Sequence, residues 1–144
     1  INKNVKRLDL SPVFHSIVED TGDKVQSRHT ILTQLRFDFS DHILVFHNAI
    51  LDWRFLKAAL KNANISAQPK LILDTLHIEK KRLICQGAEI KQDDLTLSAC
   101  RKRYELPSYH CHNALTDAQA TAELLLAQCY QINRGKELKV GELT

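Results

Sequence analysis

The chain has 144 residues, of which 44% are hydrophobic and 26% are charged, with only four glycines and three prolines. That composition is typical of one globular domain and excludes a disordered tail or a flexible linker. Its apolar runs are short, as at residues 43–46 and 124–127, and they exclude a membrane-spanning helix. The net charge of +3 is too small to identify a nucleic-acid partner by itself.

The first part of the chain predicts a strand and then a helix. Residues 5–18 alternate loosely between apolar and polar side chains and include Pro12, which predicts an outer strand or hairpin. The Thr-Gly-Asp sequence at residues 21–23 predicts a turn. Apolar side chains then follow at helical spacing from Ile31 to Phe39, and Ser27 is placed to cap that helix.

The run HILVFHN at residues 42–48 is rich in β-branched and aromatic residues and predicts a buried strand. Asn48 can cap a helix that begins at Ala49, and the loop at residues 62–69 ends that helix. Its apolar side is expected to consist of five residues: Ile50, Leu51, Phe55, Leu56 and Leu60.

The rest of the chain alternates between strand and helix. A short buried strand is predicted at residues 71–73, after which the pair Asp74-Thr75 opens a helix. Residues 114–131 are rich in Ala and Leu and predict a long helix. Between these, a helix opens at residue 93 or 94, stops before Pro107 and carries four less polar side chains: Leu95, Leu97, Cys100 and Tyr104. This alternation predicts an α/β domain with a partly parallel sheet.

The cysteines do not indicate a structural zinc site. Cys85, Cys100, Cys111 and Cys129 form no Cys-x-x-Cys pair, so we interpret them as reduced, mostly buried thiols of a cytosolic protein. The adjacent residues at positions 110–112, His-Cys-His, cannot easily converge on one tetrahedral ion.

Two basic clusters are candidate phosphate contacts. One is Lys80-Lys81-Arg82 and the other is Arg101-Lys102-Arg103. The alternative interpretation is that both are solvated helix faces, which is what most short charge runs are.

The pattern His-Asn-Ala-x-x-Asp occurs twice, at residues 47–52 and 112–117. In each copy the Asp falls in the first turn of a predicted helix, where the helix dipole favours a carboxylate. Many helices without a function start in the same way. The first copy, however, places Asp52 beyond the carboxyl end of a strand, where open α/β sheets carry their sites. The second follows a loop that contains Pro107 and can bring His112 close to Asp117.

Two carboxylates and a neutral His at one edge of a sheet are the components of a hydrolytic metal site. Carboxylate oxygens suit Mg²⁺ or Mn²⁺. A His whose pKa lies near neutrality can take a proton from water. The sequence therefore predicts metal-assisted hydrolysis at this edge.

Three segments in order, VFHNAILDWRFL, LILDTLHI and YHCHNALTDAQATAELLLAQ, resemble the DnaQ-like, or DEDDh, 3′–5′ exonucleases. This family includes the proofreading epsilon subunit of bacterial DNA polymerase III. The resemblance implies a ribonuclease H-like mixed sheet flanked by helices and two bound ions, Mg²⁺ or Mn²⁺. It also implies that Asp52 and Asp117 are metal ligands and that His112 is the general base. His110 competes for that role but does not fit the spacing to Asp117.

The resemblance also assigns structural roles at two helix starts. Asp74, in the Asp-Thr pair, is expected to be a helix-start residue rather than a metal ligand. Asn48 is expected to cap a helix rather than to contact substrate, and His47 is expected to end a strand.

The family's first motif, Asp-x-Glu, is absent from the sequence. Glu19 lies in a segment similar to a decayed copy, but it is too close to His47 for the strands and helix that the family places between them. We therefore expect residues 1–144 to form a single exonuclease-like domain that is N-terminally incomplete and lacks or truncates the first central strand. Two carboxylates cannot hold two neighbouring divalent ions, so this chain alone is expected to be inactive or nearly so.

The function expected from the resemblance is hydrolysis of phosphodiester bonds at single-stranded 3′ ends, with DNA favoured over RNA, in proofreading or repair. The expected partners are a single-stranded DNA or RNA 3′ end and a DNA polymerase, in the cytoplasm and without a membrane. One alternative is a ribonuclease of the same fold. Another is a non-catalytic exonuclease-like module that binds nucleic acid or a polymerase.

Overall fold

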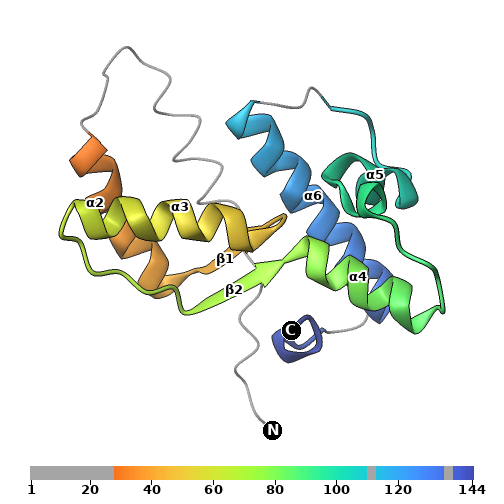
Figure 1. Ribbon diagram of the computed structural model, residues 1–144. Helices are drawn as coiled ribbons and strands as arrows, with labels where there is room; N and C mark the ends of the chain where they lie inside the picture. Colours follow the sequence, from red (N-terminus) through yellow and green to blue (C-terminus); the bar gives the residue numbers. More distant parts are fainter. Residues whose placement is uncertain (1–27, 110–112, 135–137) are drawn as a thin grey trace, which may run out of the picture.

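The structure, a computed structural model, describes residues 28–109, 113–134 and 138–144. Two strands lie at its centre, β1 (Ile43–Phe46) and β2 (Leu71–Asp74), with helices on both sides (Figure 1). The other elements in chain order are α2 (Arg28–Asp41), α3 (Ala49–Asn62), α4 (Thr75–Cys85), η1 (Gln92–Leu95), α5 (Leu97–Arg103), α6 (Ala114–Asn133) and η2 (Val140–Glu142). The predictions for residues 5–18 and 21–23 and for Ser27 lie outside the described residues.

The two strands are parallel, with Ile43 opposite Leu71 and Phe46 opposite Asp74. Parallel neighbours need a crossover connection, which α3 supplies. Both carboxyl ends consequently meet at one edge of the sheet. The predicted mixed α/β architecture with a parallel sheet is confirmed.

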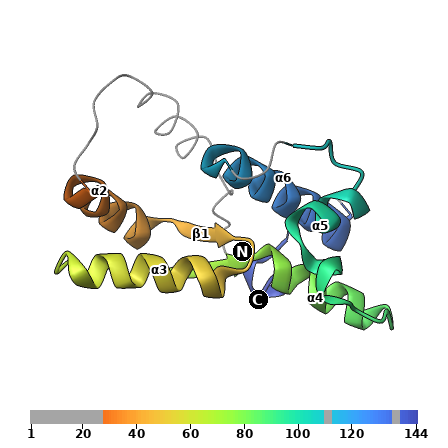
Figure 2. The ribbon, with the colours of Figure 1, turned by 45° about the horizontal axis from the view of Figure 1, so that its top comes forward.

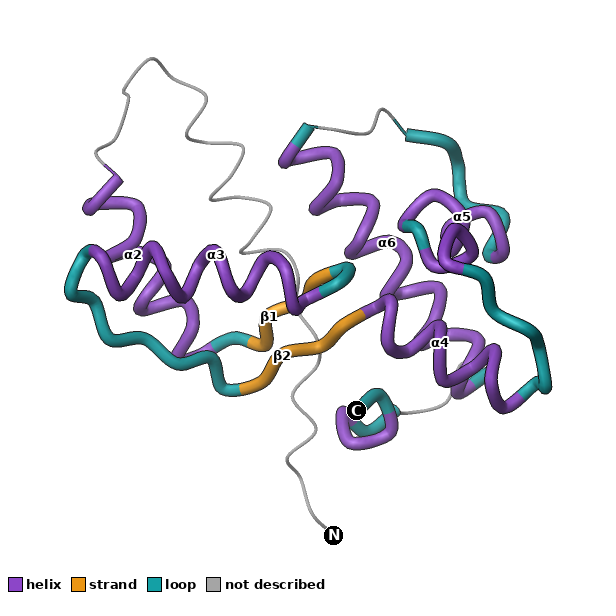
Figure 3. Tube along the Cα trace, viewed as in Figure 1, coloured by secondary structure: helices purple, strands orange, loops and turns teal. Residues whose placement is uncertain are grey.

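The strands separate two hydrophobic clusters. Alternate side chains point to opposite faces of a strand, so Val45 packs on one cluster and Leu44 on the other. The first cluster joins β2 to α4, α6 and the C-terminal segment through four buried residues: Leu73, Ile78, Leu125 and Leu143. The second joins α2 to α3 through Leu32, Phe39 and Leu60. Figure 3 shows the strands between the α2–α3 pair and the group of α4, α5 and α6, and Figure 2 shows β1 in the same place from another side.

Helix α3 begins and ends where predicted, but its predicted apolar side is only partly correct. Leu56 and Leu60 face α2, and the ring of Trp53 meets that of Phe39 edge-on at a centroid distance of 6.2 Å. The face of α3 that packs against α2 therefore contains residues 53, 56 and 60, which have the spacing of one helical face. Three other members of the predicted side are exposed: Ile50 (70%), Leu51 (51%) and Phe55 (76%).

Two further predictions need correction. Strand β1 is half-buried rather than buried. The helix expected from residue 93 or 94 is instead divided into η1 and α5. Thr96, in an extended conformation, separates them, and its hydroxyl accepts a hydrogen bond from the amide of Ala99, so α5 begins at Leu97.

The remaining predictions concern α4, α6 and the thiols. Helix α4 opens after Asp74 as expected, and α6 extends two residues beyond its predicted end. The described cysteines are free thiols, but only Cys100 is buried, and Cys85 is exposed. Burial, with a smaller contribution from the charge of Glu79, raises the pKa of Cys100 to about 11. No helix among the described residues is long and apolar enough to cross a membrane.

Candidate functional site

The carboxylate of Asp74 binds backbone amides at the edge of the sheet where the two strands end. Its Oδ1 accepts hydrogen bonds from the amides of Asn48 (2.9 Å) and Leu76 (3.0 Å), and its Oδ2 accepts one from Ala49 (3.0 Å). One side chain therefore caps the start of its own helix, α4, and also that of α3. The prediction that Asp74 is a helix-start residue is confirmed, since both of its carboxylate oxygens accept hydrogen bonds from helix-start amides.

Asn48 occupies the cap position of α3, but its side chain makes no capping hydrogen bond. Its backbone has a left-handed conformation with φ of 71°. The expectation that its side chain caps the helix is wrong, because a capping side chain requires an extended backbone at this position and that of Asn48 is left-handed. Asn suits the position because it tolerates the left-handed conformation better than most residues do.

The two Asn residues of the repeated pattern are therefore expected to respond differently to substitution. Asn113 caps α6 by accepting hydrogen bonds from the amides of Leu115 (3.0 Å) and Thr116 (3.3 Å). Asn113→Ala should lower the free energy of unfolding by about 1 kcal/mol. Asn48→Gly should leave it unchanged or raise it, because glycine adopts a positive φ readily. Urea denaturation of both variants measures the contrast, and an equal loss in both would contradict it.

His47 follows the last residue of β1 and links three elements. Its Nε2 donates to the carbonyl of Leu95 (2.9 Å), and its Nδ1 lies 2.9 Å from the hydroxyl of Thr75. A carbonyl cannot donate, so Nε2 carries a proton, and the single hydrogen of the Thr75 hydroxyl goes either to Nδ1 or to the carbonyl of Phe46, 3.2 Å away. Burial lowers the pKa of His47 below its ordinary value, against a smaller opposing effect of the Leu95 hydrogen bond. The imidazole is thus a neutral structural group, as expected for a residue at the end of a strand.

This buried imidazole predicts a pH dependence of stability. Its pKa is lower in the folded than in the unfolded chain, so protonation favours unfolding. The stabilisation is complete above pH 6.5 and is lost as the pH falls through the folded-state pKa, at a slope of at most about 1.4 kcal/mol per pH unit. Urea denaturation at about pH 8, 6 and 5 should show a smaller loss for His47→Gln than for the unsubstituted chain. Parallel pH profiles for the two proteins would refute this role.

The second copy of the pattern lies at the start of α6. Asp117 is half-buried in the first turn of this helix, and its amide donates to the carbonyl of Asn113 (2.8 Å). Helix α6 also contacts β1. His110 and His112 lie outside the described residues, so their predicted roles stay predictions.

The carboxylates of Asp52 and Asp117 differ from that of Asp74. Asp52 is exposed in the first turn of α3, and within the described ranges neither carboxylate forms a hydrogen bond or an ion pair. Their oxygens have the chemistry that Mg²⁺ or Mn²⁺ prefers. The structure does not gather a complete set of ligands, because no group of three or more His, Cys, Asp or Glu side chains among the described residues could hold a metal ion.

Comparison with known proteins identifies the family. The family model for the exonuclease family matches residues 10–125, which is most of the chain. The chain belongs to the exonuclease family. The DnaQ-like resemblance of its sequence motifs is thereby confirmed.

Individual relatives give the same result. The exonuclease domain is 31% identical over 127 residues to the 3′-5′ exonuclease DinG of Staphylococcus haemolyticus, a match that covers 86% of this chain. It is 29% identical over 119 residues to the 3′-5′ exonuclease DinG of Staphylococcus aureus, a match that covers 83% of this chain. The matches span only 13% and 11% of the lengths of those relatives. No solved structure matches the domain.

Arg101 is not the surface phosphate contact that its basic cluster suggested. Its side chain is buried and donates to the carbonyls of Ala120 (2.7 Å) and Pro107 (2.9 Å). It also pairs with Glu123 at 2.7 Å and lies over the ring of Tyr109, 5.2 Å from its centroid. In the exonuclease domain Arg101 thus joins α6 to the loop that leads to residues 110–112.

Glu79 is fully buried at the centre of a second polar network. It accepts hydrogen bonds from Arg82 (2.6 Å) and from the hydroxyl of Tyr104 (2.7 Å), and it lies 3.6 Å from Arg103. Burial alone would raise the pKa of Glu79, but the hydrogen bonds from Arg82 and Tyr104 lower it overall. The sequence analysis missed this network, although the i, i+3 spacing of Glu79 and Arg82 was a signal for the first pair.

Proposed function

We propose that this exonuclease domain belongs to a metal-dependent 3′–5′ exonuclease that hydrolyses phosphodiester bonds at single-stranded 3′ ends, with DNA as the substrate. The contrast between Asp74 and the two other aspartates supports this most directly. All three lie at helix starts, yet Asp74 accepts three amide hydrogen bonds while Asp52 and Asp117 accept none among the described residues. The 3′-5′ direction comes from the names of the relatives.

The proposed roles follow from the chemistry of the side chains. Asp52 and Asp117 would hold the metal, and His112 would accept a proton from the attacking water. Mg²⁺ or Mn²⁺, when bound, would stabilise negative charge on the phosphate. A complete two-ion site needs further carboxylates, and the sequence contains no Asp-x-Glu segment to provide them. A ribonuclease H-like fold is part of the same proposal.

The test uses this chain extended upstream by its native sequence. The extended chain is mixed with a 5′-labelled single-stranded DNA oligonucleotide and Mg²⁺, and products are separated by length. We expect products shortened stepwise from the 3′ end, with no reaction when EDTA replaces Mg²⁺. A matched RNA oligonucleotide and a blunt duplex define the substrate class. An absence of hydrolysis together with an upstream sequence that lacks an Asp-x-Glu strand would overturn the proposal.

The incomplete carboxylate set also favours a second candidate, a non-catalytic module that binds nucleic acid or a polymerase. That candidate predicts binding of single-stranded DNA without any hydrolysis, even by the extended chain. The same mixture therefore separates the two candidates when strand binding is measured beside product formation. Association with a DNA polymerase and a cytoplasmic location stay predictions.

A further inference from the structure

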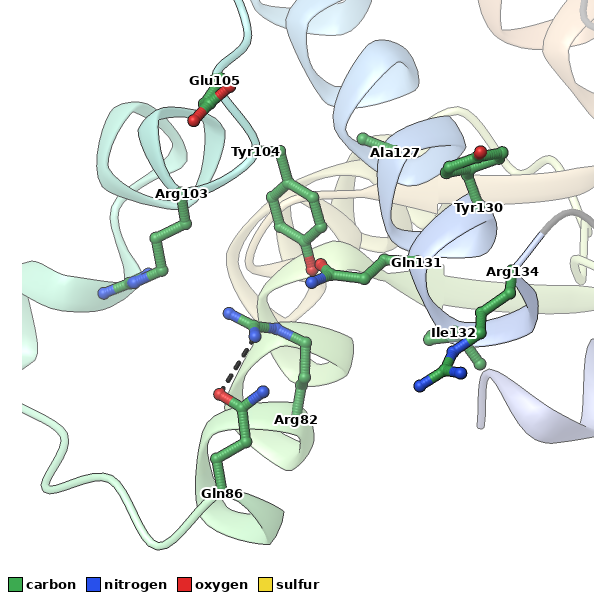
Figure 4. Close-up of a pocket in the computed structure, with 10 residues that line it drawn as sticks. All are labelled: Arg82, Gln86, Arg103, Tyr104, Glu105, Ala127, Tyr130, Gln131, Ile132 and Arg134. Atoms are coloured by element: carbon green, nitrogen blue, oxygen red, sulfur yellow. Dashed lines mark hydrogen bonds between the residues drawn. The ribbon is translucent and has the colours of Figure 1, made fainter.

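Two hollows lie beside the C-terminal end of α5, the larger between it and the C-terminal ends of α4 and α6, and the smaller between it and the loop at residues 105–109. The larger, of about 740 Å³, is bordered by residues of α4, α5 and α6, including Arg82, Arg103, Tyr130 and Arg134. Figure 4 shows Arg103 on one side of this hollow and Tyr130 and Arg134 on the other. The smaller hollow, of about 340 Å³, is bordered by Lys102, Ser108 and Tyr109 among others. Glu105 borders both hollows.

Basic side chains predominate around these hollows. Arg82 and Arg103 are partly neutralised by Glu79 and also lie in the last turns of their helices, where cations offset the carbonyl dipoles. Lys102 and Arg134 carry further positive charge, and with them the lining keeps an excess of positive charge over Glu105. A chain of phosphates is the natural complement of several cations spread along a groove.

An exposed aromatic ring accompanies these cations. Tyr130 projects from α6 with 72% of its surface exposed, beside Ala127 and Gln131 of the same helix. A ring that is this exposed contributes little to the packing of the helix. In proteins that bind single strands, aromatic rings beside cations are the usual platform on which bases stack. Beside the smaller hollow, the ring of Tyr109 lies against the guanidinium of Arg101.

The larger hollow lies along the C-terminal part of α6, which is the end of the helix far from the proposed catalytic end. Asp117 and Tyr130 are separated by 13 residues of this helix (130 − 117), which corresponds to about 20 Å along its axis. The smaller hollow borders the loop at residues 107–109, which leads towards α6 and Asp117. A strand whose 3′ end lies at Asp117 could thus reach Tyr109 and Lys102 first, and Tyr130 and Arg134 farther from its end.

We propose that these hollows form a track that binds a single strand of nucleic acid several nucleotides upstream of the 3′ end. Lys102 and Arg134 contact phosphates, and a base stacks on Tyr130. The proposal rests on the proposed function, because the direction of the track assumes a 3′ end at Asp117. It adds a preference for long strands over short ones, which the catalytic end alone does not supply.

The test measures fluorescence anisotropy of fluorescein-labelled oligo(dT) of about 4 and about 20 nucleotides, in EDTA so that no strand is cut. The unsubstituted chain should bind the 20-mer more tightly than the 4-mer. Lys102→Glu/Arg134→Glu should weaken 20-mer binding at least about tenfold and weaken 4-mer binding by a smaller factor. The slope of log affinity against log salt concentration should become shallower by about 1.4, which is about 0.7 for each phosphate that is no longer bound. Tyr130→Ala should weaken 20-mer binding at least about fivefold.

The matched control is Lys57→Glu/Lys61→Glu, which reverses two exposed charges on α3. It should change 20-mer binding less than about twofold. The track is refuted if the control weakens binding as much as the test pair, or if the 4-mer and the 20-mer bind equally. The function proposal fails separately, if the extended chain binds both strands with this pattern but cuts neither with Mg²⁺.

Discussion

Asp52→Asn and Asp117→Asn are each expected to lower the rate of 3′-end hydrolysis more than about a hundredfold, since loss of even an outer-shell partner of a metal ligand costs about 10–100-fold. Both carboxylates lie in first turns of helices and have no hydrogen-bond partner among the described residues. Their replacement by the isosteric amide therefore removes a ligand without disturbing a structural contact. The rates are measured on the upstream-extended chain with Mg²⁺ and a labelled single-stranded DNA.

Two controls separate metal binding from folding. Asp93→Asn changes a carboxylate in the first turn of η1 and should leave the rate unchanged. Asp74→Asn should lower the free energy of unfolding, because an amide side chain cannot accept at both of its terminal atoms and three backbone amides depend on them. If Asp52→Asn and Asp117→Asn keep full activity, the two residues are not metal ligands.

Glu79→Gln is expected to cause a large loss of stability, about 3 kcal/mol of the free energy of unfolding. The substitution keeps the shape of the side chain but removes the charge that Arg82 and Arg103 approach. This expected loss lies at the low end of the range for breaking a buried ion pair, because both guanidinium groups keep some access to solvent. Urea denaturation near neutral pH measures it, with the exposed Glu89→Gln as the control.

The same network predicts an acid-dependent loss of stability. The pKa of Glu79 is lower in the folded than in the unfolded chain, so its contribution is complete above the ordinary carboxyl pKa of 4.5 and is lost as the pH falls through the folded-state value. Glu79→Gln should therefore flatten the stability profile below that pH. A profile identical to that of the unsubstituted chain would show that the carboxylate is not held by Arg82 and Tyr104.

The sequence predicted helix starts well because they depend on neighbouring residues. The Asp-Thr pair before α4 and the Asn-Ala pair before α6 are local signals, and both helices begin where expected. The parallel pairing of β1 and β2 also followed from the alternation of strand and helix. Asp52 and Asp117 were placed correctly in first turns for the same local reason.

Contacts between distant segments could not be predicted from local patterns. Asp74 caps α3 only because the parallel register brings the end of β2 beside that of β1. Arg101 looked like one member of a surface charge run, yet its carbonyl partner in α6 is 19 residues away in sequence. Burial of Glu79 likewise depends on how α4 packs against α5 and α6.

The three amides bound by Asp74 connect two helix starts through one side chain. If the carboxylate moves away, the amides of Asn48, Ala49 and Leu76 lose their acceptor at the same moment. Their hydrogen exchange should accordingly report a single opening event with one shared free energy. The first turn of α3, which carries Asp52, should therefore open only when the contact between the two strand ends opens. An ordinary exposed helix terminus would open more easily.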